Sequence, residues 1–263
     1  MRVREDSIKI GNTEIDYVSF GRGTQPLVLI PGLSLRDVKG SGTLLAYMYR
    51  MFSKDYKVFC IDKKRIIPID YTVEEIAEDY SMALRALNIE KACILGISQG
   101  GMIAQYLALN HSELVQKLVL GVTLSRNNET VISCINEWIH MAESGNFKAL
   151  GIDILRKTYS EEYIKKYAWL FPILSKIMKP ENSERFIALA KSCLTCNTYD
   201  RLEEIKCPVY VIGGCKDKVV TGEASYEIAS KIGCSIYMYE NLGHAAYDEA
   251  KDFNKRVYDF FRN

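Results

Sequence analysis

The hydrophobic residues of this chain form short continuous runs that alternate with longer amphipathic segments. An uninterrupted apolar run of strand length is typical of a strand buried on both faces of a sheet. The runs lie at residues 27–30, 58–61, 93–97, 118–122, 209–212 and 236–239, and helical patterns lie at 43–52, 72–87, 102–109, 223–231 and 247–261. Strands that alternate with helices predict an α/β fold, in which a mainly parallel sheet carries helices on both faces.

The N-terminal segment has a different pattern. Residues 7–10 and 14–20 alternate in polarity around Gly11-Asn12, and Gly21-Arg22-Gly23 follows them. Two alternating segments joined by a glycine-containing turn predict an antiparallel hairpin.

The stretch from residue 125 to residue 200 interrupts the alternation. It contains several amphipathic helix candidates and no convincing strand, and both tryptophans of the chain, Trp138 and Trp169, lie in it. We therefore expect a core domain formed by residues 1–124 and 201–263, with residues 125–200 inserted as a helical cap over the sheet.

Charge and apolar length exclude several classes of protein. Lys and Arg number 34 against 33 Asp and Glu, which leaves a net charge of +1 and no excess of positive charge for a nucleic-acid backbone. No apolar stretch approaches the roughly 20 residues that a bilayer requires, and the first residues, MRVREDSIKI, carry charges where a signal peptide has its apolar region. We expect a cytoplasmic protein that binds neither nucleic acid nor membrane.

The eight cysteines do not predict a metal or redox centre. Cys60 and Cys93 lie inside apolar runs, as small buried side chains do. Cys193 and Cys196 form a C-x-x-C pair, but no second pair of ligands accompanies it, whereas a structural zinc site needs four. We expect no metal site and no organic cofactor.

The sharpest chemical motif is Gly96-Ile97-Ser98-Gln99-Gly100, which directly follows a buried strand and directly precedes a helix. This is the context of a G-x-S-x-G nucleophile elbow. The turn is so tight that the serine adopts a strained backbone, and the residues two positions away on each side must lack bulk. The motif predicts that Ser98 is presented at the carboxyl end of the sheet, where open α/β folds bind ligands.

A serine hydroxyl needs an adjacent base, and the chain has three histidines. His244 is the best candidate, because it follows the last strand in a glycine-containing loop. His111 ends the helix after the elbow, and His140 lies in the insertion. The acid that orients the base is expected to be Asp217, which follows the preceding strand; Asp62, at the end of another strand, is its rival.

Acyl transfer also requires hydrogen-bond donors for a developing oxyanion. The backbone N–H of Gln99, next to the nucleophile, is one candidate. The loop Pro31-Gly32-Leu33-Ser34 follows the strand at 27–30, and the backbone N–H of Leu33 is the natural second donor.

Together these motifs resemble the α/β-hydrolase superfamily, in its capped branch of serine esterases and lipases. The resemblance covers nearly the whole chain and rests on Ile30-Pro31-Gly32, the Ser98 pentapeptide, Gly213-Gly214-Cys215-Lys216-Asp217 and Gly243-His244. It implies an α/β-hydrolase fold with nucleophile, acid and base in the order Ser98, Asp217, His244.

Two loops depart from the pattern of the superfamily. Many relatives have His-Gly where this chain has Pro31-Gly32, so its loop lacks one possible hydrogen-bonding side chain. Many also have Asp-x-Arg-Gly-x-Gly-x-Ser after the next strand, where this chain reads Asp62-Lys63-Lys64-Arg65-Ile66-Ile67 without glycines. Two interpretations of the basic triplet stay open: a solvated loop, or a site that attracts an anionic group.

We therefore expect a carboxylesterase-like serine hydrolase that cleaves an ester or related acyl bond of a small, partly apolar substrate. Carbon–carbon bond hydrolases, lactonases and thioesterases use the same triad, and some proteins that resemble this superfamily are low-turnover small-molecule receptors. Trp138, His140 and Trp169 are the cap residues expected near the substrate, although the tryptophans could instead pack within the cap. The sequence does not indicate an oligomeric state.

Overall fold

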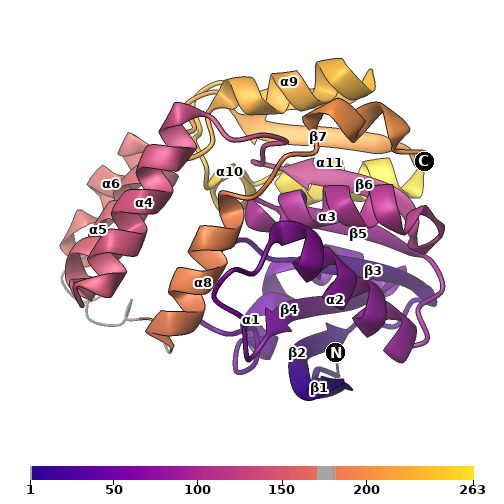
Figure 1. Cartoon of the computed structure of the whole chain (residues 1–263). Coiled ribbons are helices and arrows are strands. Elements are labelled where there is room, and N and C mark those ends of the chain that lie inside the picture. The colour runs from indigo at the N-terminus through magenta and orange to yellow at the C-terminus, as the bar shows by residue number, and fades with distance from the viewer. Residues whose placement is uncertain (1, 171–179, 181) are drawn as a thin grey trace.

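The computed structural model describes residues 2–170, 180 and 182–263, so residues 171–179 and 181 of the predicted cap lie outside the described part. Within that part, the strands form an eight-stranded sheet with the order β1-β2-β4-β3-β5-β6-β7-β8 (Figure 1). The strands are β1 (Arg4–Ile10), β2 (Thr13–Phe20), β3 (Gln25–Ile30), β4 (Tyr56–Lys64), β5 (Ala92–Ile97), β6 (Val115–Gly121), β7 (Val209–Gly214) and β8 (Ser235–Tyr239).

Strand directions confirm both the hairpin and the parallel sheet. β1 and β2 pair antiparallel from Arg4↔Ser19 to Ile10↔Thr13, and β2 pairs antiparallel with β4. From β4 through β3, β5, β6 and β7 to β8, every neighbouring pair is parallel. Parallel strands end at the same edge of the sheet, so the loops that follow β3, β5, β7 and β8 can meet there.

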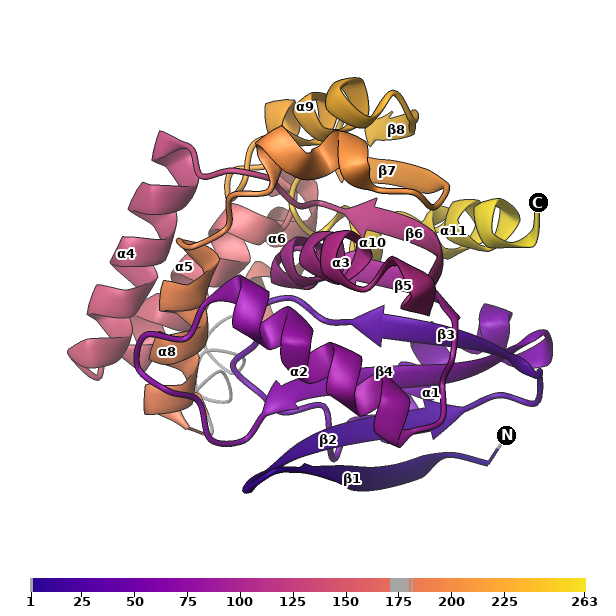
Figure 2. The same cartoon turned by 45° about the vertical axis from the view of Figure 1, so that its right-hand side comes forward.

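Helices cover both faces of the sheet, as the sequence pattern predicts (Figure 2). Residues of α2, α3 and α9 belong to one hydrophobic cluster, and residues of α1 and α11 belong to a second cluster on the opposite face. The helices of the core are α1 (Gly42–Met48), α2 (Val73–Ala86), α3 (Gln99–Asn110), α9 (Gly222–Ile232), α10 (Ala246–Glu249) and α11 (Phe253–Arg262), with 3-10 turns at Arg50–Lys54 and Ser112–Leu114.

The sequence predicted the start of one helix correctly and the extent of another incorrectly. Thr72 caps α2 through a complete capping box with Glu75, as the sequence predicts. The single helix expected at 247–261 is instead two helices, α10 and α11, because Ala250 adopts an extended backbone between them.

The inserted segment is helical in its described part. It contains α4 (Glu129–Glu143), α5 (Phe147–Thr158), α6 (Glu161–Tyr167) and α8 (Ser183–Cys193), with 3-10 turns at Ala168–Leu170 and Tyr199–Glu204. Figures 1 and 2 show these four helices beside the carboxyl ends of the parallel strands. The chain enters and leaves the insertion side by side, since Arg126 and Asn197 form an antiparallel bridge. The division into a core and a cap at residues 125–200 stays a prediction of the sequence. Across the described residues, no helix has both the length and the apolar character needed to cross a membrane.

Candidate active site

Ser98 occupies the turn between β5 and α3 with a strained backbone. Its φ of 54° and ψ of −121° lie in a region that residues with a Cβ rarely adopt. A Cβ at Gly96 would lie 2.5 Å from the Gly100 carbonyl oxygen, and a Cβ at Gly100 would lie 1.9 Å from the Ile30 carbonyl oxygen. The turn therefore closes only because neither flanking position carries a side chain.

The neighbouring strand holds this turn in place. The Ser98 N–H donates to the Gly121 carbonyl at 2.9 Å, and the Thr123 hydroxyl donates to the Ser98 carbonyl at 2.7 Å. With its backbone bonded on both sides to β6 and the residues after it, Ser98 projects its hydroxyl from a rigid position.

Asp217 and His244 reach Ser98 from the loops that follow β7 and β8. His244 Nδ1 lies 2.8 Å from Asp217 Oδ2, and His244 Nε2 lies 2.9 Å from Ser98 Oγ. Because a carboxylate only accepts hydrogen bonds, Nδ1 carries the proton, and the neutral ring leaves Nε2 free to accept from the Ser98 hydroxyl. The structure thus brings together the three side chains that the sequence placed in this order.

The acid and the base are each fixed by further hydrogen bonds. Asp217 Oδ1 accepts from the backbone N–H groups of Val219 and Val220 at 2.7 and 3.0 Å. The N–H of Ala245, next to His244, donates to the Thr158 carbonyl at the end of α5 at 2.8 Å. The orientation of the imidazole therefore depends on the core and on the inserted helices together.

The rival residues of the sequence analysis have other partners. His111 Nε2 lies 2.8 Å from a Glu78 carboxylate oxygen. The Asp62 carboxylate accepts from the Val38 backbone N–H at 2.9 Å and from the Arg185 guanidinium at 3.0 Å. These contacts assign both side chains to the support of the fold.

The two predicted oxyanion donors belong to segments that meet at the nucleophile. A Cβ built on Gly32 would lie 3.2 Å from Ser98 Cβ, so the loop after β3 runs against the elbow. Leu33 lines the same cavity as Ser98, and α3 begins at Gln99. The buried Gln99 side chain has a separate task, because its Nε2 donates to the Leu189 carbonyl and the Ser192 hydroxyl of α8. The donor roles of the two N–H groups stay predictions.

A cavity of about 350 Å³ opens at Ser98 and His244. Core and insertion both line it, and its apolar wall is formed by Leu33, Leu35, Ile97, Trp138, Ile154 and Phe186. Arg36, Tyr159 and Tyr247 add polar groups. Neither Arg36 nor Tyr247 was predicted from the sequence, although Arg36 lies three residues after Leu33 and Tyr247 three residues after His244.

The three predicted cap residues have different positions. Trp138 lines the cavity, and its indole N–H donates to Asp153 at 2.7 Å. Among the described residues that line the cavity, neither His140 nor Trp169 is present. His140 is exposed, because two positions along a helix correspond to a rotation of about 200° away from Trp138. Trp169 lies in a 3-10 turn with no buried residue and is 72% exposed.

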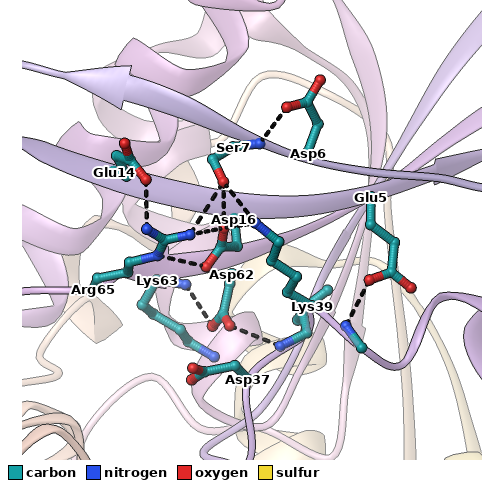
Figure 3. Close-up of polar contacts among 12 residues, drawn as sticks. Glu5, Asp6, Ser7, Glu14, Asp16, Asp37, Lys39, Asp62, Lys63 and Arg65 are labelled. Carbon is teal, nitrogen blue, oxygen red and sulfur yellow. Dashed lines mark hydrogen bonds and ion pairs between the residues drawn. The ribbon is translucent and has the colours of Figure 1, made fainter.

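The basic triplet after Asp62 is neither a solvated loop nor an open anion site. β4 continues through Lys64, which explains why the segment needs no glycines. Lys64 Nζ lies 3.3 Å from Asp79, and Arg65 pairs with Glu14 and Asp16, as Figure 3 shows for Arg65.

Lys63 is the exceptional member of the triplet. It is 3% exposed, and burial lowers the pKa of its ammonium group to about 8. Its Nζ donates to the carbonyl oxygens of Pro31 and Gly32. The positive charges of the triplet are therefore paired with groups of the protein itself: Lys63 is buried, Lys64 is half-buried, and Arg65 forms its ion pairs at the surface.

No group of three or more His, Cys, Asp or Glu side chains in the described ranges could hold a metal ion. Cys193 and Cys196 are both buried, and burial raises the pKa of the Cys193 thiol to about 12. A thiol with so high a pKa is a poor metal ligand and a poor nucleophile at neutral pH.

Comparisons with known proteins match this chain to a family model and to hydrolases. A family model for the alpha/beta hydrolase fold matches residues 26–144. The chain is 21% identical to 3-oxoadipate enol-lactonase 2 of Acinetobacter baylyi, over 82% of this chain and 81% of that protein. It is 24% identical to the 2-hydroxy-6-oxononadienedioate/2-hydroxy-6-oxononatrienedioate hydrolase of Paraburkholderia xenovorans, over 99% of this chain and 93% of that protein.

Solved structures give the same answer for the architecture. The enol-lactonase of Burkholderia xenovorans LB400 superposes with a TM-score of 0.86 at 20% identity, over 98% of this chain and 100% of that one. The matched residues 26–144 include the loop after β3 and the Ser98 elbow. This chain therefore has the α/β-hydrolase fold.

Proposed function

We propose that this protein is a serine hydrolase that cleaves a carboxylic ester or a related acyl bond of a small, partly apolar substrate. The observation that carries the proposal is the continuous hydrogen-bonded path from Ser98 Oγ through both nitrogens of His244 to Asp217. A hydroxyl whose proton has such a route to a base becomes a nucleophile at neutral pH.

The reaction proceeds in two stages. Ser98 Oγ bonds to the substrate carbonyl carbon while His244 Nε2 takes the hydroxyl proton, and the Asp217 carboxylate stabilises the resulting imidazolium. The carbonyl oxygen, now negatively charged, accepts hydrogen bonds from the N–H groups of Leu33 and Gln99. The carbon–oxygen bond to the alcohol then breaks, and the alcohol leaves with the proton from His244.

Water completes the second stage. It gives a proton to His244 and attacks the acyl carbon, after which Ser98 leaves with that proton and the carboxylic acid is released. The apolar wall around Trp138 and Phe186 favours substrates with an apolar acyl or alcohol group.

A lactone, which is a cyclic ester, is a specific candidate within this class. Proteins named enol-lactonase occur among both the curated relatives and the similar solved structures. The carbon–carbon bond hydrolase among the relatives makes cleavage of a carbon–carbon bond the second candidate.

Hydrolysis of short p-nitrophenyl esters tests the proposal. Ser98→Ala should lower kcat by roughly 10⁴ or more, because the hydroxyl that forms the acyl-enzyme is gone. Ser81→Ala is the matched control, since Ser81 is a buried serine of α2 bonded to the Glu78 carbonyl. Dihydrocoumarin tests the lactone candidate with the same variants.

Labelling identifies the nucleophile independently of the substrate. A fluorophosphonate should form a single adduct on Ser98, and His244→Ala should abolish it. Ester hydrolysis that is unchanged in Ser98→Ala would refute the serine mechanism. Tight ligand binding without turnover would favour a receptor.

A further inference from the structure

A lysine ammonium group is buried against the loop that follows β3. Lys63 is 3% exposed, and its Nζ donates to the Pro31 carbonyl oxygen at 2.6 Å and to the Gly32 carbonyl oxygen at 2.7 Å. Removing a charged amine from water costs free energy unless its hydrogens are paired. Short charge-assisted hydrogen bonds offset part of that cost, and both of these bonds go to the same loop.

The bond to the Gly32 carbonyl determines which way the next N–H points. In a trans peptide, such as that between Gly32 and Leu33, the C=O and N–H groups point in opposite directions. With the Gly32 oxygen on Lys63 Nζ, the Leu33 N–H points away from Lys63. Gly32 and Leu33 line the cavity beside Ser98, whereas Lys63 is not among its described lining residues. The cavity and Lys63 therefore both border this peptide, and only the side bonded to Lys63 is occupied by its ammonium group.

This peptide needs an external constraint. A Cβ on Gly32 would lie 3.2 Å from Ser98 Cβ and 3.7 Å from Ser98 Oγ, so the peptide unit lies beside the nucleophile. Glycine permits backbone conformations that other residues do not, and the peptide after it can rotate more freely. Two hydrogen bonds from one charged group remove that freedom.

We propose that Lys63 is a positioning residue for catalysis, whose ammonium group holds the Gly32–Leu33 peptide so that the Leu33 N–H faces the oxyanion. The inference rests on the proposed function, since an oxyanion forms only if Ser98 attacks a carbonyl carbon. Lys63 does not touch the substrate; it acts through the loop.

The position of Lys63 is itself fixed by a buried charge cluster. The Asp62 carboxylate accepts from the Lys63 N–H at 2.7 Å, as Figure 3 shows. Arg185 of α8 donates to Asp62 at 3.0 Å and to the Lys63 carbonyl at 2.8 Å. The Arg185 guanidinium also lies 2.9 Å from Asp37, which follows the loop of residues 31–34. A displacement of the end of β4 would therefore break several charged contacts.

Lys63→Met tests the inference, with Lys64→Met as the matched control. Lys64 is the next residue of β4, but its ammonium group contacts Asp79 and the ring of Tyr71. Loss of an oxyanion donor costs about 10²–10³ in kcat, so misplacement of one should cost roughly 10- to 100-fold. We expect Lys63→Met to lower kcat by that factor with KM within about twofold of wild type, because ground-state binding does not use this N–H.

A tetrahedral inhibitor separates positioning from a merely structural role. Phenylboronic acid forms a tetrahedral adduct with a reactive serine, and its affinity should fall in Lys63→Met by a factor similar to that in kcat. Lys64→Met should match wild type in both measurements. Lys63→Gln keeps an N–H donor for one of the two carbonyls and should give an intermediate loss of kcat and of inhibitor affinity. If Lys63→Met fails to fold, kcat and inhibitor affinity of Lys63→Gln test the inference instead.

The outcomes distinguish this inference from the proposed function. Ser98-dependent hydrolysis with unchanged kcat and inhibitor affinity in the Lys63 variants would overturn the inference alone. The same holds if KM rises while kcat is unchanged, or if Lys64→Met loses as much kcat as Lys63→Met. An absence of Ser98-dependent hydrolysis in the wild type would overturn both.

Discussion

Replacement of Asp217 with asparagine should move the proton on His244 to the wrong nitrogen. Asp217 Oδ1 accepts from the N–H groups of Val219 and Val220, so the asparagine oxygen must remain at that position. The amide NH₂ then occupies the place of Oδ2, 2.8 Å from His244 Nδ1, and donates to it. A neutral ring that accepts at Nδ1 carries its hydrogen at Nε2, facing Ser98.

The expected loss is large, because an Nε2 that already bears a hydrogen cannot accept the Ser98 proton. The equivalent change in the serine-protease triad lowers kcat by about 10⁴, so we expect a similar factor, or about 5 kcal/mol of barrier, for Asp217→Asn. Stability should change little, since both backbone hydrogen bonds to the former Oδ1 remain.

The assay compares kcat for a p-nitrophenyl ester with the thermal midpoint of each variant. Asp16→Asn is the control, because Asp16 is also buried but pairs with Ser7 and Arg65 near the β1 edge of the sheet. Asp16→Asn should retain hydrolysis even if its midpoint falls. Retention of activity within about tenfold in Asp217→Asn, with Ser98→Ala inactive, would refute Asp217 as the orienting acid.

Two further predictions concern the elbow and the buried lysine. Gly100→Ala should lower the free energy of unfolding by about 1–3 kcal/mol and reduce hydrolysis, because its Cβ would lie 1.9 Å from the Ile30 carbonyl oxygen. Chemical denaturation and ester hydrolysis measure both effects. Gly145→Ala, whose Cβ would meet nothing within 4 Å but whose φ is +70°, should lower the free energy of unfolding and leave hydrolysis unchanged. Burial lowers the pKa of Lys63 from 10.5 to about 8. Between about pH 8 and pH 10.5 the unfolded chain therefore binds more protons at this group than the folded protein does, so the free energy of unfolding increases as pH rises. The unfolding free energy of wild type relative to Lys63→Met should therefore increase by up to about 3 kcal/mol across this range, and a constant difference would contradict the assignment.

Local sequence signals were sufficient for the fold and for the positions of the three central side chains. Continuous apolar runs mark strands whose both faces are covered, and a strand that ends in glycine places the next polar residue at the edge of the sheet. The spacing Gly96-x-Ser98-x-Gly100 is itself a steric requirement of the turn, so the strained Ser98 backbone could be predicted without coordinates.

The sequence predicted the helices of the insertion but not which face of each helix meets the cavity. An amphipathic pattern predicts a helix, but which face meets the cavity depends on packing against the core. Trp138 faces the cavity and His140, two positions further, faces solvent. Nothing in the sequence near Trp169 indicated that its side chain would be 72% exposed.

Local sequence patterns predicted the strands, the elbow and the identity of Ser98, Asp217 and His244 as candidates, because each pattern is a short run of neighbouring residues. The burial of Lys63 was decided only by tertiary structure. Its partners Pro31 and Gly32 lie on another strand end, and Arg185, which anchors it, lies on an inserted helix more than a hundred residues away. Three consecutive basic residues suggest a solvated segment until the fold brings acids and carbonyl oxygens to them, because the free energy of a charge depends on what surrounds it in space.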